Sequence, residues 1–275
     1  MRARALAISL SVALAMAHAA GDAAAQNISL GSKTDKPVEI YASEGIEWRR
    51  DSQTYIARGD ARAVQGDTTV SADTLTAHYR TKPDGNTEIA RIEADGAVRI
   101  TTPTQQARGD RGVYDVEKGV LVLTGRDITF TTPRETLTAR DSLEYWEQRR
   151  IAVARGNAVA TSEGRKLRAD LITAYFVNDG DSAKLDRVDV QGNVQVATAT
   201  EFVRADQGVY APKSGVATLT GGVKITRGPN QLNGDYAEVN LNTGVSRLMS
   251  RNQRVRGLLV PPQSSGAPPP PAPRR

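Results

Sequence analysis

Aspartate recurs in this sequence in a regular series, and such carboxylates could bind a metal or act as a paired acid and base. The six aspartates follow one another at intervals of 29 to 37 residues: Asp73, Asp110, Asp141, Asp170, Asp206 and Asp235. A calcium loop takes its oxygen ligands from closely spaced positions, which these intervals cannot provide. We therefore expect these side chains to form hydrogen bonds at turns or bends of the chain.

Few other residues could do chemistry. The sequence has no cysteine, which excludes disulfides, thiolate metal ligands and thiol nucleophiles. His78 lies in an expected strand without a partner histidine, so we expect a surface position. Trp48 and Trp146 could be platforms for a sugar or a lipid, but ordinary packing is the simpler expectation. The sequence thus predicts no catalytic residue, no metal site and no cofactor.

Short β-strands are expected over nearly the whole chain, because apolar and polar residues alternate. Val98 and Ile100, for example, are separated by Arg99, and turn residues follow about every ten positions. No segment shows the apolar spacing and caps of an amphipathic helix. The sequence therefore predicts an all-β fold of about fourteen strands, with one apolar face and one polar face along the whole body.

The body also contains an internal tandem duplication. Residues 107–125 (ARGDRGVYDVEKGVLVLTG) match residues 203–221 (VRADQGVYAPKSGVATLTG), 96 positions later. We place the repeat units at about 56–148 and 153–243. Glycines recur in mid-strand at positions 59, 96, 125, 156, 192 and 221. A glycine at the same place in each strand bends the sheet about one axis, which predicts an elongated structure whose apolar inner face is a groove or a closed core.

The N-terminus has the features of a cleaved export signal at residues 1–25. Arg2 and Arg4 precede an apolar stretch at residues 5–17, and small residues precede a cleavage site after residue 25, or alternatively after residue 19. The apolar stretch is shorter than the ~20 residues of a spanning helix, which argues against a retained anchor. A polar leader (residues 26–37) precedes the body, which covers residues 38–246.

The C-terminal residues 247–275 are rich in proline and arginine, and we expect them to be a disordered tail. The chain has 36 basic and 31 acidic residues, for a net charge of +5. Because this tail contains six arginines and no acidic residue, the positive charge belongs to the tail. The body therefore shows no sign of binding nucleic acid.

The ordered series of motifs resembles the OstA-like family. The segments that carry the resemblance are Gly192-Asn193-Val194-Gln195-Val196, Ala169-Asp170 followed by Tyr175, and Leu219-Thr220-Gly221. The match covers about residues 38–246; each motif is weak, but their order is specific. The resemblance implies an elongated open β-jelly roll, V-shaped in section, of stacked antiparallel strand pairs around an apolar interior that holds the acyl chains of lipopolysaccharide.

The resemblance also implies a periplasmic, non-enzymatic bridge that carries lipopolysaccharide from the inner to the outer membrane. Its partners would be an LptC-like inner-membrane anchor and an LptD-like outer-membrane translocon, joined end to end by strand addition, and head-to-tail self-association is a further expectation. On this interpretation eight residues line the lipid groove: Val98, Ile100, Ile128, Phe130, Val194, Val196, Val223 and Ile225.

Two alternatives use the same sequence features. A secreted β-solenoid scaffold or adhesin would bury the same apolar residues in a closed core and would bind no lipid. A polysaccharide-cleaving β-helix enzyme would need clustered carboxylates and a basic residue on one outer face. Lipid bound to the purified protein would separate the first alternative from the groove, and an activity assay would expose the second.

Overall fold

The computed structural model describes residues 38–83, 85–179, 182–240, 242–243, 245–250 and 255–260. The expected signal peptide and the polar leader lie outside the described residues, as do residues 261–275 of the expected tail. Every regular element in the described ranges is a β-strand, which confirms the all-β fold class. In these ranges there is no helix whose length and hydropathy would suit a membrane span.

The strands form one antiparallel sheet. The N-terminal half contains β1 (Glu39–Tyr41), β2 (Gly45–Arg49), β3 (Thr54–Gln65), β4 (Thr68–Thr81), β5 (Thr87–Thr101), β6 (Gln106–Asp115), β7 (Val120–Thr124) and β8 (Ile128–Thr131). The C-terminal half contains β9 (Glu135–Ala139), β10 (Ser142–Trp146), β11 (Ile151–Ser162), β12 (Arg165–Asp179), β13 (Ser182–Ala197), β14 (Glu201–Ala211), β15 (Val216–Arg227), β16 (Asn230–Asn240), β17 (Val245–Met249) and β18 (Arg256–Leu258).

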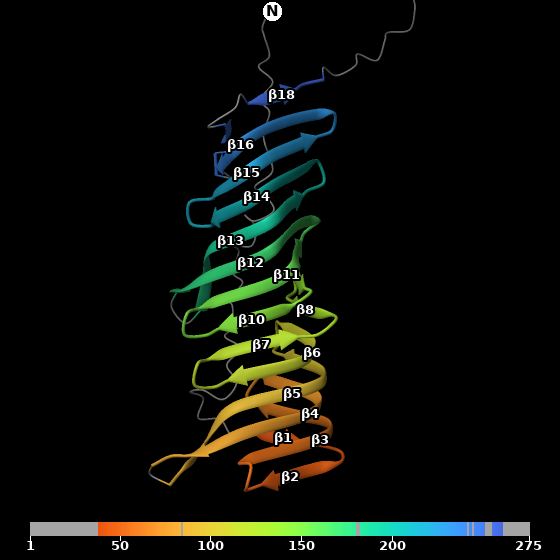
Figure 1. Cartoon of the computed structure of the whole chain (residues 1–275), viewed down its shortest axis with the longest axis vertical. Helices are drawn as coiled ribbons and strands as arrows, with labels where there is room; N and C mark the ends of the chain where they lie inside the picture. Colours follow the sequence, from red (N-terminus) through yellow and green to blue (C-terminus); the bar gives the residue numbers. More distant parts are fainter. Residues whose placement is uncertain are drawn as a thin grey trace, which may run out of the picture.

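These strands stack as rungs along one long axis, in sequence order from β1 and β2 at one end to β18 at the other (Figure 1). Four rungs consist of two short strands that share a long neighbour. β2 and β1 both pair with β3, β7 and β8 with β6, β10 and β9 with β11, and β17 and β18 with β16. Eighteen strands thus make fourteen rungs, in line with the expected number.

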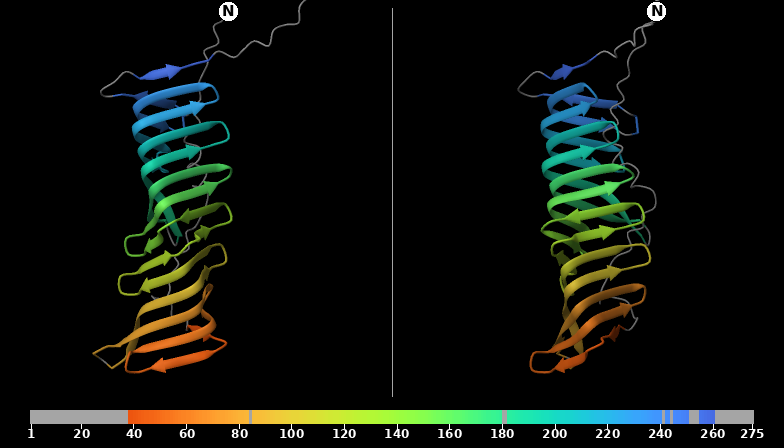
Figure 2. Two further views of the ribbon diagram at one scale, coloured as in Figure 1. Left: turned by 45° about the vertical axis from the view of Figure 1, so that its right-hand side comes forward. Right: turned by 90° about the vertical axis from the view of Figure 1, so that its right-hand side faces the viewer.

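Each long strand bends near its middle, and the bends divide the sheet into two walls. The register shifts at the bend, as between Gln191 and Val194 where β13 pairs with β14. The backbone there enters the left-handed region, with φ of 81° at Gly96 and 75° at Gly192. We call the wall that contains β2, β7, β10 and β17 the first wall, and the wall that contains β1, β8, β9 and β18 the second. Figure 2 shows the resulting stack from two further directions.

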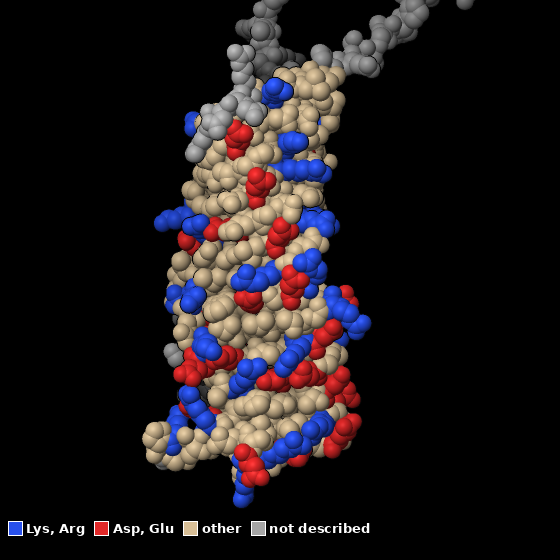
Figure 3. All heavy atoms as spheres, in the orientation of Figure 1, with Lys and Arg blue, Asp and Glu red and all other residues tan. Residues whose placement is uncertain are grey.

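The core lies on the inner faces of the two walls and runs through both halves. One cluster of buried apolar residues extends from Ala57 in β3 to Val239 in β16. Arginine, lysine and acidic side chains alternate over the outer surface in the view of Figure 3. The period-two pattern therefore sorts side chains as expected, apolar inward and polar outward.

Ordered strand structure extends further toward the C-terminus than the sequence predicted. β17 runs through Arg247 to Met249, and β18 follows at Arg256–Leu258. Strand residues therefore occur on both sides of the expected boundary at residue 246. Two apolar positions allow this extension: Leu248 pairs with Ala237 and packs against the core, and Gly257 pairs with Leu232.

Candidate functional site

The eight residues predicted to line a groove all lie on the second wall. They come from β5, β8, β13 and β15, and seven of them are no more than 3% exposed, while Phe130 packs against the core and is partly buried. The structure brings them together in two groups, one in each half. Val98 and Ile100 lie across β6 from Ile128 and Phe130, while Val194 and Val196 lie across β14 from Val223 and Ile225.

The inner face of the first wall was not part of that prediction. Its buried side chains include Tyr114 and Tyr210, which are among the largest fully buried residues, together with Leu123 and Leu219. The tyrosines recur 96 positions apart, so their spacing was a usable signal. The sequence showed the two tyrosines as members of the repeat, but it did not show that their rings lie in the apolar interior. The apolar interior is thus formed by both walls.

The recurring aspartates do not form a metal site. No group of three or more histidine, cysteine or acidic residues that could hold a metal ion occurs in the part of the chain that the structure describes. The aspartates form hydrogen bonds at the bends instead: Asp110 Oδ2 accepts one from the backbone N–H of Arg126 at 3.0 Å, and Asp170 Oδ2 one from Asn193 Nδ2 at 2.7 Å. Both contacts lie at the junction between the walls.

The two ends of the stack expose apolar side chains. Twelve large apolar residues are exposed in the described ranges, and eleven of them lie within residues 38–48 or 245–260. At the N-terminal end, Ile46 and Trp48 are about half exposed. Trp48 packs on one side only: the centre of its ring lies 5.7 Å from the centre of the stacked Tyr55 ring, and its Nε1 donates a hydrogen bond to the Tyr79 hydroxyl at 2.9 Å. Both ends therefore combine a strand edge with unburied apolar surface.

Charged side chains flank the N-terminal edge and one turn of the second wall. Hydrogen bonds from Arg49 and then Arg58 lower the pKa of Glu47 to about 2. Burial, with a smaller contribution from the Glu163 charge, raises the pKa of Glu135 above its ordinary value. His78 lies 3.5 Å from Glu93 on the outer face and is exposed, the surface position expected for it.

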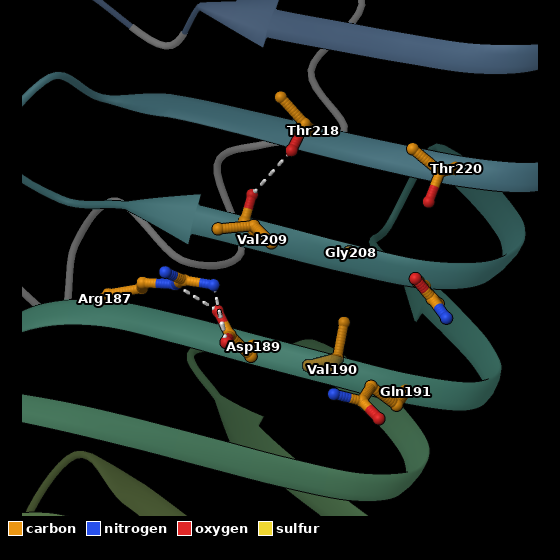
Figure 4. Close-up of a pocket in the computed structure, with 9 residues that line it drawn as sticks. Arg187, Asp189, Val190, Gln191, Gly208, Val209, Thr218 and Thr220 are labelled. Atoms are coloured by element: carbon orange, nitrogen blue, oxygen red, sulfur yellow. Dashed lines mark hydrogen bonds and ion pairs between the residues drawn. The ribbon is translucent and has the colours of Figure 1, made fainter.

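A small polar depression lies on the outer face of the first wall, over β13, β14 and β15 (Figure 4). The Arg187 guanidinium forms an ion pair with Asp189, with nitrogen–oxygen distances of 2.5 and 2.8 Å. Its other polar lining residues are Gln191, Gln207, Thr218 and Thr220, and Val190, Gly208 and Val209 complete the lining. These residues could not be predicted as a site from the sequence, because nothing in their spacing distinguishes them from other outward-facing positions.

An elongated sheet folded into two walls around one apolar interior is the architecture of a β-jelly-roll carrier or scaffold. The family of lipopolysaccharide transport proteins that includes LptA and the LptD N-terminal domain matches the chain twice, over residues 40–141 and 138–245. The chain belongs to this family. Because its members are transport proteins, the prediction of a non-enzymatic protein is confirmed.

Two further proteins are similar to parts of the chain. A protein of Rhizobium meliloti (strain 1021) described as uncharacterized is 30% identical over 101 residues, which are 35% of this chain and 54% of that protein. The match thus spans about half the length of that curated relative. LptH of Pseudomonas aeruginosa, the LptA-homologous periplasmic component of the lipopolysaccharide transport device, covers 44% of this chain with 83% of its own, at 20% identity and a TM-score of 0.37. At that score the superposition carries no argument by itself.

Proposed function

We propose that this protein is a periplasmic bridge that binds lipopolysaccharide and carries it from the inner to the outer membrane. The observation that carries the proposal is the continuous apolar inner face, which runs through both halves in a chain of the lipopolysaccharide transport family. Each CH₂ group of an acyl chain removed from water contributes about 0.8 kcal/mol. A long apolar interior is therefore suited to shielding acyl chains, and the eight second-wall residues are the proposed lining.

Periplasmic location is part of this proposal. The expected signal at residues 1–25 supports export, and membership of the lipopolysaccharide transport family is consistent with it. The proposal includes cleavage after residue 25 and transport toward the outer membrane.

Acyl chains can enter only if the walls separate, because the lining residues are almost fully buried. The same burial favours a second candidate, a scaffold with a closed core and no lipid cargo. The two candidates differ in one respect that can be measured: the inner faces of a carrier must contact lipid in the cell, whereas those of a scaffold must not.

The ends of the stack support joining by strand addition to LptC-like and LptD-like partners. The internal junction between the halves shows what such a joint looks like. There β10 pairs with β7, and β9 pairs with β8. The N-terminal edge has the same arrangement: β2 and β1 pair with β3 in the way that β10 and β9 pair with β11. In this comparison Ile46, which pairs with Ala57, is the counterpart of Leu143, which pairs with Ala154.

Burial differs sharply between these equivalent positions. Leu143 is 8% exposed at the internal junction, whereas its counterpart Ile46 is 54% exposed at the N-terminal edge. Covering β2 and β1 with a strand pair like β7 and β8 would bury Ile46 and Trp48 in the same way. Head-to-tail self-association would use the same edge and remains a prediction.

The experiment that tests the carrier is photocrosslinking to lipopolysaccharide in cells. A photoreactive amino acid replaces Val98, Val194 or Phe130, which face inward, or the outward-facing Arg99, Gln195 or Thr129 on the same strands. Phe130 is the most conservative site, because an aromatic probe replaces an aromatic, partly buried side chain. Adducts at the inward sites alone support the carrier. Folded variants that give no adduct at any inward site would move the assignment to the closed scaffold.

A further inference from the structure

The polar depression on the outer face is present in one half of the molecule and filled in the other. In the C-terminal half, Gln191, Gln207 and Thr220 lie opposite one another on β13, β14 and β15. The corresponding row in the N-terminal half is Asp95, Arg111 and Thr124 on β5, β6 and β7. The two halves therefore present the same backbone with different side chains.

A single arginine fills the N-terminal counterpart. Arg111 lies 2.9 Å from Glu93 and 3.2 Å from Asp95, so its side chain crosses the face between two carboxylates. Gln207 takes its place in the C-terminal half and is too short to do the same. Because the N-terminal half folds with the arginine present, the open depression is not a requirement of the fold.

The groups that line the depression suit a neutral ligand with many hydroxyls. The charges of Arg187 and Asp189 balance each other in one ion pair. Around that pair, the amides of Gln191 and Gln207 can each donate and accept hydrogen bonds. The Thr220 hydroxyl can do the same, whereas Thr218 Oγ1 already donates to the Val209 carbonyl at 3.5 Å. Such a set offers little to a free anion or cation.

An aromatic ring borders the same surface. Tyr175 pairs with Arg187 in the neighbouring rung β12, and the Arg187 guanidinium carbon lies 5.6 Å from the centre of its ring. The ring therefore holds the guanidinium of Arg187 in place at the border of the depression and does not itself line it. The balanced donors and acceptors of the lining are what the hydroxyls of a sugar require.

We propose that the outer face of β13–β15 is a saccharide-binding site that holds a neutral sugar against Arg187, Asp189, Gln191 and Gln207. This site is separate from the apolar interior and does not depend on the carrier proposal. Two sources contain neutral sugar units of this kind: the glycan strands of the cell wall and the oligosaccharide of lipopolysaccharide, whose acidic groups would lie outside the site. The test distinguishes them.

The full-length protein is titrated with two soluble sugars that carry no acyl chain. One is a β-1,4-linked N-acetylglucosamine oligosaccharide, and the other is the core oligosaccharide of lipopolysaccharide after removal of its lipid. Binding is followed by NMR through the side-chain amides of Gln191 and Gln207. Failure here leaves the crosslinking test of the carrier untouched, since neither sugar can occupy the interior.

The decisive variant is Gln207→Arg, which places an arginine at the position that Arg111 occupies in the N-terminal half. It is expected to lower sugar affinity at least about tenfold. The matched control is Gln195→Arg, the same substitution on the outer face of the second wall, which is expected to leave the affinity unchanged. The sugar that binds identifies the source. The proposal is overturned if neither sugar perturbs the two amides at about 10 mM, or if Gln207→Arg binds as the unmodified protein does.

Discussion

The carboxylate of Asp170 occupies the space into which a side chain at Gly192 would project. The two residues belong to neighbouring strands, β12 and β13, and they lie at the bend that separates the walls. The backbone of Gly192 has a φ of 75°. Asp73 has the same relationship to Gly96, and Asp206 to Gly221. The repeated aspartate and the repeated glycine are thus two halves of one contact.

Replacing Gly192 by alanine should destabilise the fold for two reasons, the left-handed backbone and the contact with Asp170. Strained backbone positions of this kind cost about 1–3 kcal/mol. Denaturant unfolding of Gly192→Ala should show a free energy of unfolding lowered by an amount at or above the top of that range, because the Asp170 carboxylate must also move.

Gly164 provides the matched control, since its φ is 76° but no atom lies within 4 Å of the place of its missing Cβ. Gly164→Ala should therefore show the backbone cost alone. Adding Asp170→Ala to Gly192→Ala should recover part of the loss. Equal destabilisation at the two glycines would contradict a role for the aspartate contact.

The N-terminal edge should lose its partner when its exposed apolar side chains become charged. On the proposal of strand addition, Trp48→Glu and Ile46→Glu should each weaken binding of the partner that joins this edge by about 2 kcal/mol, roughly thirtyfold, as expected for central apolar contacts. The affinity of the purified pair is the measurement. Tyr41→Glu, on the outward face of β1, should bind normally. Wild-type affinity in Trp48→Glu would show that the partner docks elsewhere.

Glu135 should make the stability of the protein depend on pH. Burial raises its pKa above the ordinary value of 4.5, so the folded state binds this proton more tightly than the unfolded state does. Its stabilising contribution is complete below the unfolded pKa and is lost as the pH rises through the folded pKa. Glu135→Gln should therefore be more stable than the unmodified protein at neutral pH, and the difference should vanish near pH ~3.

The free energy of unfolding of both proteins, measured from about pH 3 to neutral pH, shows whether Glu135→Gln is the more stable one. Glu163→Gln is the companion variant, because Glu163 raises the pKa of Glu135 through its charge. It should shift the transition to lower pH without removing it. A Glu135→Gln variant that is less stable at neutral pH would mean that the ionised carboxylate stabilises the fold.

The buried second-wall residues should matter far more for stability than their outward neighbours. Ile225 is 2% exposed, and Lys224 precedes it on the opposite face of β15. Ile225→Ala should lower the free energy of unfolding by about 2–5 kcal/mol, the usual cost of truncating a buried isoleucine. Lys224→Ala should change it by less than about 0.5 kcal/mol. A small effect at Ile225 would indicate that the walls are already loosely packed.

Much of the fold could be predicted because strand geometry is local. A period of two places alternate residues on opposite faces, so the sequence alone assigns Val194 to the inner face and Gln195 to the outer face. The bends could be placed at glycines such as Gly192, because few other residues adopt a left-handed backbone. The duplication followed from matched spacing, which includes Tyr114 and Tyr210.

The partners of these residues could not be predicted, because pairing between strands depends on register and on loop length. Asp170 lies 14 residues after Gly156, yet its carboxylate meets Gly192, 22 residues further on. Likewise, sequence spacing did not show that β5 and β8 pair with opposite edges of β6. This pairing places Ile100 and Phe130 on either side of one residue of β6.

Residues close together in the chain were enough to predict the strand class, the apolar and polar faces, the positions of the bends and the family. The folded structure was needed to know which residues lie side by side across the rungs. It closed Val98 and Val223 into a buried interior, left Trp48 half exposed at an end, and opened a depression beside Gln207. The physical reason is that burial and contact depend on both walls together, and the two walls come from segments far apart in the sequence.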